Sequence, residues 1–186
     1  DRGDAWDFPI DYQNYPSRCF TPQSREVFQQ GPSVVCRTHY SYAESVLTQD
    51  VVLLAGSRRL DFVTQVKWQE RDKMLRTSFP VNVVMGDAHG EIQFGHVRRE
   101  THGNTIKDFT DYDVVAHKWM DISRRNYGAS VLNDCKYGYN VSDNTIDLCL
   151  LRSANYPAPD ADAGSHQFTY SYFPHAGDHV TGGVIH

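Results

Sequence analysis

From Val34 onward, apolar and polar residues alternate in short segments along the chain. In residues 60–69, for example, Leu60, Phe62, Val66 and Trp68 occupy alternate positions. A period of two is typical of strands with one buried face. Similar segments are expected at 34–42, 45–54, 75–84, 91–97, 114–122, 129–132, 146–152 and 167–173. Because no stretch of ten or more residues has a helical pattern, the sequence predicts an all-β protein.

Short turn-forming strings separate these segments. Ala55-Gly56-Ser57 and the string from Asn140 to Asn144 are examples, and such spacing favours successive hairpins over βαβ units. Residues 155–165 contain two prolines, which remove backbone donors, so we expect a loop there. We therefore predict an antiparallel β-sandwich.

The first thirty residues have poor apolar periodicity and are rich in Asp, Pro, Tyr, Arg and Ser. We predict an irregular N-terminal arm or linker at 1–30 and a β-sandwich domain at 31–186. Because the chain starts with Asp1 and without the order of a signal peptide, we interpret this end as cut or processed.

Composition and charge exclude several classes of function. The net charge is -5 and the pI is about 6.0, which gives no basic surface for nucleic acid. No apolar run approaches the ~20 residues needed to span a bilayer, so no membrane is expected. The four cysteines include no C-x-x-C pair and are interpreted as buried thiols of a cytoplasmic protein, although the sequence leaves a disulfide open.

Two arrangements of polar residues resemble metal sites in part. His175 and His179 have the i,i+4 spacing of helical ligands, but Pro174 and Gly177 disfavour a helix. The string Asp160-Ala-Asp-Ala-Gly164 resembles the start of a calcium loop but lacks the closing Glu. We predict a polar turn there and no metal site in this chain.

The segment Glu91 to Thr105 combines a predicted strand with a loop of hydrogen-bonding side chains. Arg99, His102 and Asn104 belong to this loop. Planar donors held on a rigid β scaffold suit the recognition of sugar hydroxyl groups, and the alternative is an ordinary solvated loop.

Longer strings resemble the C-terminal region of glycoside hydrolase family 38 α-mannosidases, in the branch that includes cytosolic and vacuolar enzymes. They extend over about Gly31 to Asp178, with a shorter match at Ala5-Trp6-Asp7. The most specific are Glu91-Ile-Gln-Phe-Gly95, Thr101-His102, Asn104-Thr105, His117-Lys118-Trp119, Leu132 to Tyr139, Leu150 to Ser153, Pro157-x-Pro-Asp-x-Asp162 and His166-x-Phe-Thr-Tyr170. Thr48-Gln-Asp50, Arg59 to Phe62, Trp68 and Glu70-Arg71 are similar as well.

The resemblance implies a galactose mutarotase-like supersandwich and, in the parent enzyme, a retaining exo-α-mannosidase that acts on mannosyl glycans with zinc. In that family the zinc ligands and the nucleophile lie in an N-terminal domain, and no matching string is present here. We therefore expect no catalytic residue and no bound zinc in this chain, which would be inactive alone. Its partner would be the catalytic domain of the same enzyme, and a homo-oligomer is left open.

As substrate contacts on one wall of the sugar pocket we predict Arg99, His102 and Asn104, followed by Trp6 and Asp7. Glu100 and Gly103 stand where the family usually has Pro and Arg, so the loop is altered in this chain. The alternatives are a stand-alone carbohydrate-binding module and a purely structural sandwich. A domain that has lost its catalytic partner should expose an apolar patch larger than that of ordinary monomers.

Overall fold

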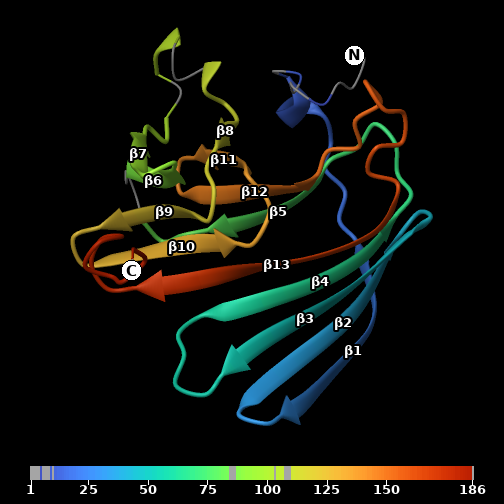
Figure 1. Ribbon diagram of the computed structural model, residues 1–186, viewed down its shortest axis with the longest axis horizontal. Coiled ribbons are helices and arrows are strands. Elements are labelled where there is room, and N and C mark those ends of the chain that lie inside the picture. Colours follow the sequence, from blue (N-terminus) through green and yellow to red (C-terminus); the bar gives the residue numbers. More distant parts are fainter. Residues whose placement is uncertain are drawn as a thin grey trace. The chain divides into compact units, whose positions relative to one another are not determined.

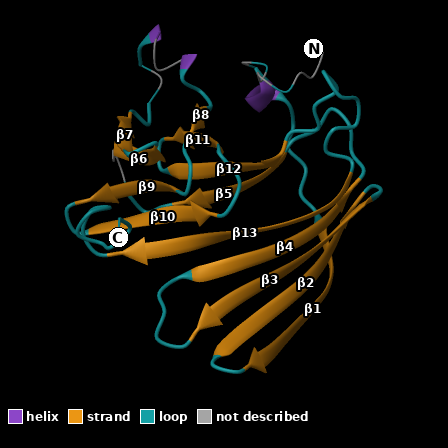
Figure 2. Cartoon of the chain, viewed as in Figure 1, coloured by secondary structure: helices purple, strands orange, loops and turns teal. Residues whose placement is uncertain are grey.

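The computed structural model describes residues 5, 9, 11–83, 87–102, 104–106 and 110–185. Nearly all regular structure in these ranges is β-strand, as Figure 2 shows. The elements are η1 (Tyr12–Asn14), β1 (Thr21–Gln30), β2 (Ser33–Tyr42), β3 (Ser45–Leu54), β4 (Leu60–Trp68), β5 (Leu75–Pro80), β6 (Asp87–Ile92), β7 (Gly95–Arg99), β8 (Val114–Val115), β9 (Trp119–Arg124), β10 (Tyr127–Asn133), β11 (Gly138–Ser142), β12 (Thr145–Leu151) and β13 (Gly164–His175). No described helix is long and apolar enough to cross a membrane.

The chain divides into two compact units, whose strands are labelled in Figure 1. The meander unit comprises the described residues up to Ser57, Asp61–Leu75 and Leu151–Thr169. Its strands follow the order β1-β2-β3-β4-β13, and β1, β2 and β3 form consecutive antiparallel hairpins. The sandwich unit comprises the described residues within 58–60, 76–150 and 170–185, so β13 contributes residues to both units.

The sandwich unit contains strands of two sheets, with orders β13-β10-β9-β6-β7 and β5-β12-β11-β8. In the first sheet, register places Ala129 opposite Ile122 and Val131 opposite Met120 on one face. In the second, Leu148 lies opposite Tyr139. All six of these side chains are fully buried, because both sheets turn their apolar alternate positions inward. The predicted all-β antiparallel sandwich is confirmed.

The irregular arm is shorter than the predicted span of 1–30. Residues 21–30 form β1, which pairs with β2 along its length. The strand was missed because its side chains are almost all exposed, so it has no need for apolar residues at alternate positions. The boundary at residue 30 also differs from the division into two units.

Two further segments differ from the sequence expectations. The predicted strand 91–97 is two strands, β6 and β7, joined by a turn at Gln93 and Phe94. Residues 138–142, part of which was interpreted as a break, form β11. There Asn140 is buried, and its amide donates a hydrogen bond to the Tyr112 carbonyl, so a residue common in turns fits inside a strand.

Candidate functional site

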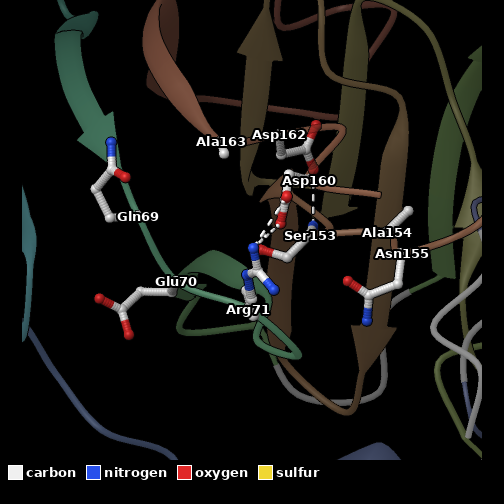
Figure 3. Close-up of a pocket in the computed structure, with 9 residues that line it drawn as sticks. All are labelled: Gln69, Glu70, Arg71, Ser153, Ala154, Asn155, Asp160, Asp162 and Ala163. Carbon is white, nitrogen blue, oxygen red and sulfur yellow. Dashed lines mark hydrogen bonds and ion pairs between the residues drawn. The ribbon is translucent and has the colours of Figure 1, made fainter. Parts of the chain in front are cut away.

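A polar pocket of about 200 Å³ lies within the meander unit (Figure 3). This volume is below the roughly 300–1,000 Å³ of typical ligand pockets, so only a small ligand group would fit. Two distant stretches of the chain meet there. The lining residues are Gln69, Glu70, Arg71, Ser153, Ala154, Asn155, Asp160, Asp162 and Ala163.

An ion pair crosses the pocket between Arg71 and Asp160. The Arg71 Nη2 atom lies 2.8 Å from Oδ1 and 3.0 Å from Oδ2 of Asp160, and Figure 3 shows the two side chains reaching toward each other. The side chains are 72% and 41% exposed. Because exposed ion pairs contribute only about 0–1 kcal/mol, a ligand can replace this pairing at little cost.

Asp162 and Ser153 fix the shape of the pocket. One oxygen of Asp162, Oδ2, accepts hydrogen bonds from the backbone N–H groups of Arg152 at 2.9 Å and Ser153 at 2.7 Å. The Ser153 hydroxyl accepts a 2.7 Å bond from the indole N–H of buried Trp68. Ser153 also has a φ of 54°. These bonds hold the loop against β4, so Asp162 and Ser153 are structural.

Glu70 is the buried acid of the pocket, with its side chain only 5% exposed. Its carboxylate accepts bonds from Lys73 Nζ at 2.7 Å and from the Ser45 hydroxyl at 3.1 Å. Burial would raise the pKa of Glu70, but the hydrogen bonds from Lys73 and Ser45 outweigh it and lower the pKa below its ordinary value. Because it stays ionised, Glu70 is a poor general acid.

The remaining lining groups are amides and charged side chains on the surface of the pocket. Asn155 donates a 2.5 Å bond to Asp72, while Gln69 and Arg71 are exposed. Donors and acceptors placed side by side suit a ligand with many hydroxyl groups. Because Glu70 is held by Lys73 and Ser45 and Asp162 is held by backbone donors, the exposed Gln69 and Arg71 are the groups that a ligand could reach.

The predicted substrate contacts Arg99, His102 and Asn104 lie in and after β7, in the sandwich unit. Arg99 Nη2 donates to the Val115 carbonyl at 3.2 Å, and its Nε is buried without a hydrogen-bond partner among the described residues. Both His102 and Asn104 are exposed. The other two predictions, Trp6 and Asp7, lie outside the described residues.

Glu100, the departure noted in the sequence, contacts a predicted site residue. Its carboxylate lies 3.4 Å from His102 Nε2 and 3.2 Å from Arg98 Nη2. Arg98 also pairs with Asp87 at 2.8 Å. A ligand that used His102 would therefore have to compete with Glu100. Gly103, the second departure, is outside the described residues.

The histidines and aspartates weighed as metal ligands have other partners. The Nε2 atom of His175 lies 2.7 Å from Asp121 Oδ2, and His179 Nε2 lies 3.3 Å from His96 Nε2. Asp160 and Asp162 bind Arg71 and backbone N–H groups, as described above. In the part of the chain that the structure describes, no group of three or more His, Cys, Asp or Glu residues could hold a metal ion.

Residues 1–160 match the family described as the glycosyl hydrolases family 38 C-terminal domain. The chain belongs to glycosyl hydrolase family 38. It is 40% identical over 188 residues to "Alpha-mannosidase G" of Dictyostelium discoideum, and 45% identical over 141 residues to human "Alpha-mannosidase 2C1". These alignments cover 98% and 76% of this chain but only 17% and 14% of the relatives.

Solved structures agree with this family 38 assignment at the level of the fold. An α-mannosidase from Enterococcus faecalis V583 superposes with a TM-score of 0.72 at 16% identity, over 85% of this chain and 22% of that one. A putative aldose 1-epimerase from Klebsiella pneumoniae superposes with a TM-score of 0.52 at 10% identity, over 86% of this chain and 55% of that one. The mutarotase-like fold that the resemblance implied is confirmed.

The pocket of the meander unit contains residues from three family 38 strings. Glu70-Arg71, Ser153 and the Pro157 to Asp162 loop were each recognised as family strings, yet none was predicted to form a site. Their convergence was missed because about eighty residues separate the two stretches and because each string contains structural residues. Arg71 and Asp160 carry opposite charges and lie in two different family strings. This was the one signal that could have predicted that the two strings come together.

Proposed function

We propose that this family 38 chain is the non-catalytic β-sandwich part of a zinc-dependent retaining exo-α-mannosidase, in which it supports the catalytic domain and forms one wall of the sugar pocket. The observation on which this depends is the family 38 C-terminal match over residues 1–160, in a chain that covers only 17% and 14% of two relatives named as α-mannosidases. The substrate is a glycan with terminal α-mannosides.

The chemistry itself belongs to polypeptide outside these residues. Retaining glycosidases use two carboxyl groups about 5 Å apart, and in this proposal both acids and the zinc come from the catalytic domain. The described residues offer no metal-binding group, so no catalytic step is assigned to them. The proposed location is the cytoplasm, which agrees with four free cysteines. The expectation that they are buried is wrong, since Cys19 and Cys135 are exposed and Cys36 and Cys149 are half-buried.

The proposed wall of the pocket is the loop after β7. His102 and Asn104 are exposed and follow β7, an edge strand of the sandwich unit's larger sheet, so their side chains are accessible beside a strand that the sheet holds in place. Arg99 is the last residue of β7, and its bond to the Val115 carbonyl holds the start of the loop. Trp6 and Asp7 stay in the proposal as contacts from the N-terminal arm.

The proposal is tested first by hydrolysis of an aryl α-mannoside. The parent polypeptide should cleave it, lose activity with a zinc chelator and recover it when zinc is restored. The 186-residue chain alone should show no activity. Cleavage by the chain alone would overturn the assignment of the chemistry to another domain.

A second test addresses the wall of the pocket. In the parent enzyme, His102→Ala should lower kcat/KM for the aryl α-mannoside by about tenfold or more, equivalent to about 1.4 kcal/mol of transition-state binding. Arg125→Ala is the matched control, since Arg125 is exposed in the turn between β9 and β10 of the same unit. Equal values for both variants would rule out the role of the β7 loop in substrate binding.

The pocket of the meander unit favours a second candidate, a carbohydrate-binding module. Its supporting observation is the cluster of Gln69, Arg71, Asn155 and Asp160 around about 200 Å³ of space. If this candidate is correct, calorimetry should detect mannose binding by the chain alone, and Arg71→Ala should abolish it. Arg25→Ala, an exposed arginine on β1, is the control. If the chain alone did not bind mannose, the carbohydrate-binding candidate would be ruled out and the scaffold role would remain.

A further inference from the structure

One face of β1, β2 and β3 carries a contiguous set of apolar side chains. In antiparallel pairs, residues directly opposite each other share a face. Register places Val34 opposite Leu53, and it places Cys36 opposite both Val27 and Val51. Since residues two apart on a strand also share a face, these five side chains form two neighbouring rows. We call them the aliphatic patch.

The aliphatic patch is open to solvent in the chain. Val27 is 65% exposed, Val34 50% and Leu53 43%, while Cys36 and Val51 are half-buried. Single exposed apolar side chains are normal on protein surfaces, but contiguous sets mark places where another surface packs.

The opposite end of the same face is covered. There Thr38, Ser45 and Leu47 are buried. Phe20, which precedes β1, lies 5.6 Å from Tyr42 and 6.4 Å from Trp68 between ring centroids. This face is thus buried at one end by residues of the same chain. At the other end, the aliphatic patch remains exposed.

The other face of these strands is suited to water in its middle section. Arg37 makes two 2.7 Å bonds with Asp50, and His39 lies 2.9 Å from the Thr48 hydroxyl. At the level of the aliphatic patch, this other face carries Val35, which is 2% exposed and lies opposite Phe28 and Val52. Both faces are therefore apolar at this end of the strands, and the patch differs in that Val27, Val34 and Leu53 are exposed while Val35 is buried.

We propose that the aliphatic patch packs against apolar polypeptide from the remainder of the α-mannosidase. The inference rests on the proposed function, because it requires a longer parent enzyme. It is supported by the shares that this chain covers, 22% of the superposed α-mannosidase and 55% of the superposed epimerase. Proteins with this fold therefore contain polypeptide beyond the part that this chain matches, and that polypeptide is the proposed occupant.

The test uses the parent enzyme with a charge placed on either face of the same hairpin. Val34→Asp would bury a carboxylate if the patch is covered, and the half-life of the parent at a fixed high temperature should fall about tenfold. Val46→Asp is the matched control, because Val46 is 53% exposed and register places it on the opposite face. Its half-life should stay near that of the wild type.

Val34→Thr and Val46→Thr repeat the comparison with a nearly isosteric change, in case Val34→Asp fails to fold. The same ranking with a smaller difference supports the proposal. Equal half-lives within both pairs would overturn it, since the patch would then be open in the parent. Dissociation of a parent dimer into monomers on Val34→Asp, measured by sedimentation, would also overturn it in favour of a second copy.

Hydrolysis by the wild-type parent is measured separately. A parent that lacks mannosidase activity but shows the Val34 effect would refute the proposed function and leave the packing surface intact. An active parent without the Val34 effect would refute only the packing surface.

Discussion

The sandwich unit and the β1–β3 region of the meander unit have the same alternating pattern but different surroundings. On β9 and β10, the apolar positions Met120 and Val131 are fully buried. On β2 and β3, Val34 and Leu53 occupy equivalent alternate positions and remain half exposed. An alternating pattern therefore predicts that one face of a strand is buried. It does not predict whether the residues that bury this face belong to the same chain.

The second face of the sandwich unit's larger sheet strengthens the contrast. It carries a buried polar cluster in which Asp121 accepts bonds from Ser130, Ser123 and His175. The C-terminal residues cover this cluster, since a Cβ on Gly182 would lie 2.3 Å from His175 Nδ1. Around Asp121, β9 and β10 are thus enclosed on both faces by residues of their own unit, whereas the meander unit leaves part of one face open.

The largest expected effect compares two carboxylates that are held by a side-chain partner, one from each region. His175 and Asp121 are 2.7 Å apart with side chains that have no exposed area, while Arg37 and Asp50 are equally close but 37% and 20% exposed. We expect His175→Ala to lower the free energy of unfolding by about 3–5 kcal/mol, because it leaves a buried carboxylate short of a donor. Arg37→Ala should cost about 1 kcal/mol or less.

Urea denaturation of the two variants and the wild type checks this ranking. If the two variants lost similar amounts of unfolding free energy, the cluster around Asp121 would be no better enclosed than the β2–β3 surface. The two regions would then differ only in the types of side chain that they carry.

An intermediate effect is expected from pH, again within the sandwich unit. His89 and His179 stack with ring centroids 4.2 Å apart. Burial lowers the pKa of both below the ordinary value of 6.5, and neighbouring histidines lower it further. The unfolded chain therefore binds more protons near pH 6, so the stability from these residues is complete above about pH 6.5 and is lost as the pH falls below it.

Urea midpoints measured at pH 7.5 and at pH 5.5 test this sign. The wild type should be less stable at pH 5.5, and His89→Gln combined with His179→Gln should reduce the difference. His39→Gln serves as the control, because His39 is exposed on β2. A loss of stability on raising the pH would contradict the expected linkage.

The sequence pattern predicted the strands whose alternate residues are buried inside the chain. Ile146, Leu148 and Leu150 of β12 are buried, and this segment was predicted with nearly correct bounds. β1 was missed because exposed strands need no apolar alternation. The turn at Gln93 and Phe94 was missed because neither residue is typical of a two-residue hairpin turn.

The candidate sites were harder to predict, for a physical reason. Binding pockets are formed by side chains that come together only after folding, as Arg71 and Asp160 do. Family strings located the polar segments but not their partners, and they did not show that Glu100 contacts His102. The roles predicted for Arg99, His102 and Asn104 stay predictions until the parent enzyme is assayed.

The smallest expected effect concerns Phe94, an exposed apolar residue in the otherwise well-covered sandwich unit. Phe94 is 110% exposed and has a φ of 62°, between Ile92 and Gly95, which pair directly. A left-handed conformation costs a bulky residue about 1–2 kcal/mol, whereas the side chain buries no area that glycine would lose. Since glycine adds about 0.5–1 kcal/mol of unfolded-state entropy, Phe94→Gly should stabilise the chain by about 0.5–1 kcal/mol.

Asp143→Gly is the matched control, because Asp143 has a φ of 53° in the turn between the paired residues Ser142 and Thr145. Aspartate tolerates this conformation better than phenylalanine, so the gain from Asp143→Gly should be close to zero. Thermal denaturation of both variants measures the difference. A loss of stability for Phe94→Gly would show that the ring is held by contacts, and the sandwich unit would then share with the meander unit an apolar surface that binds another group.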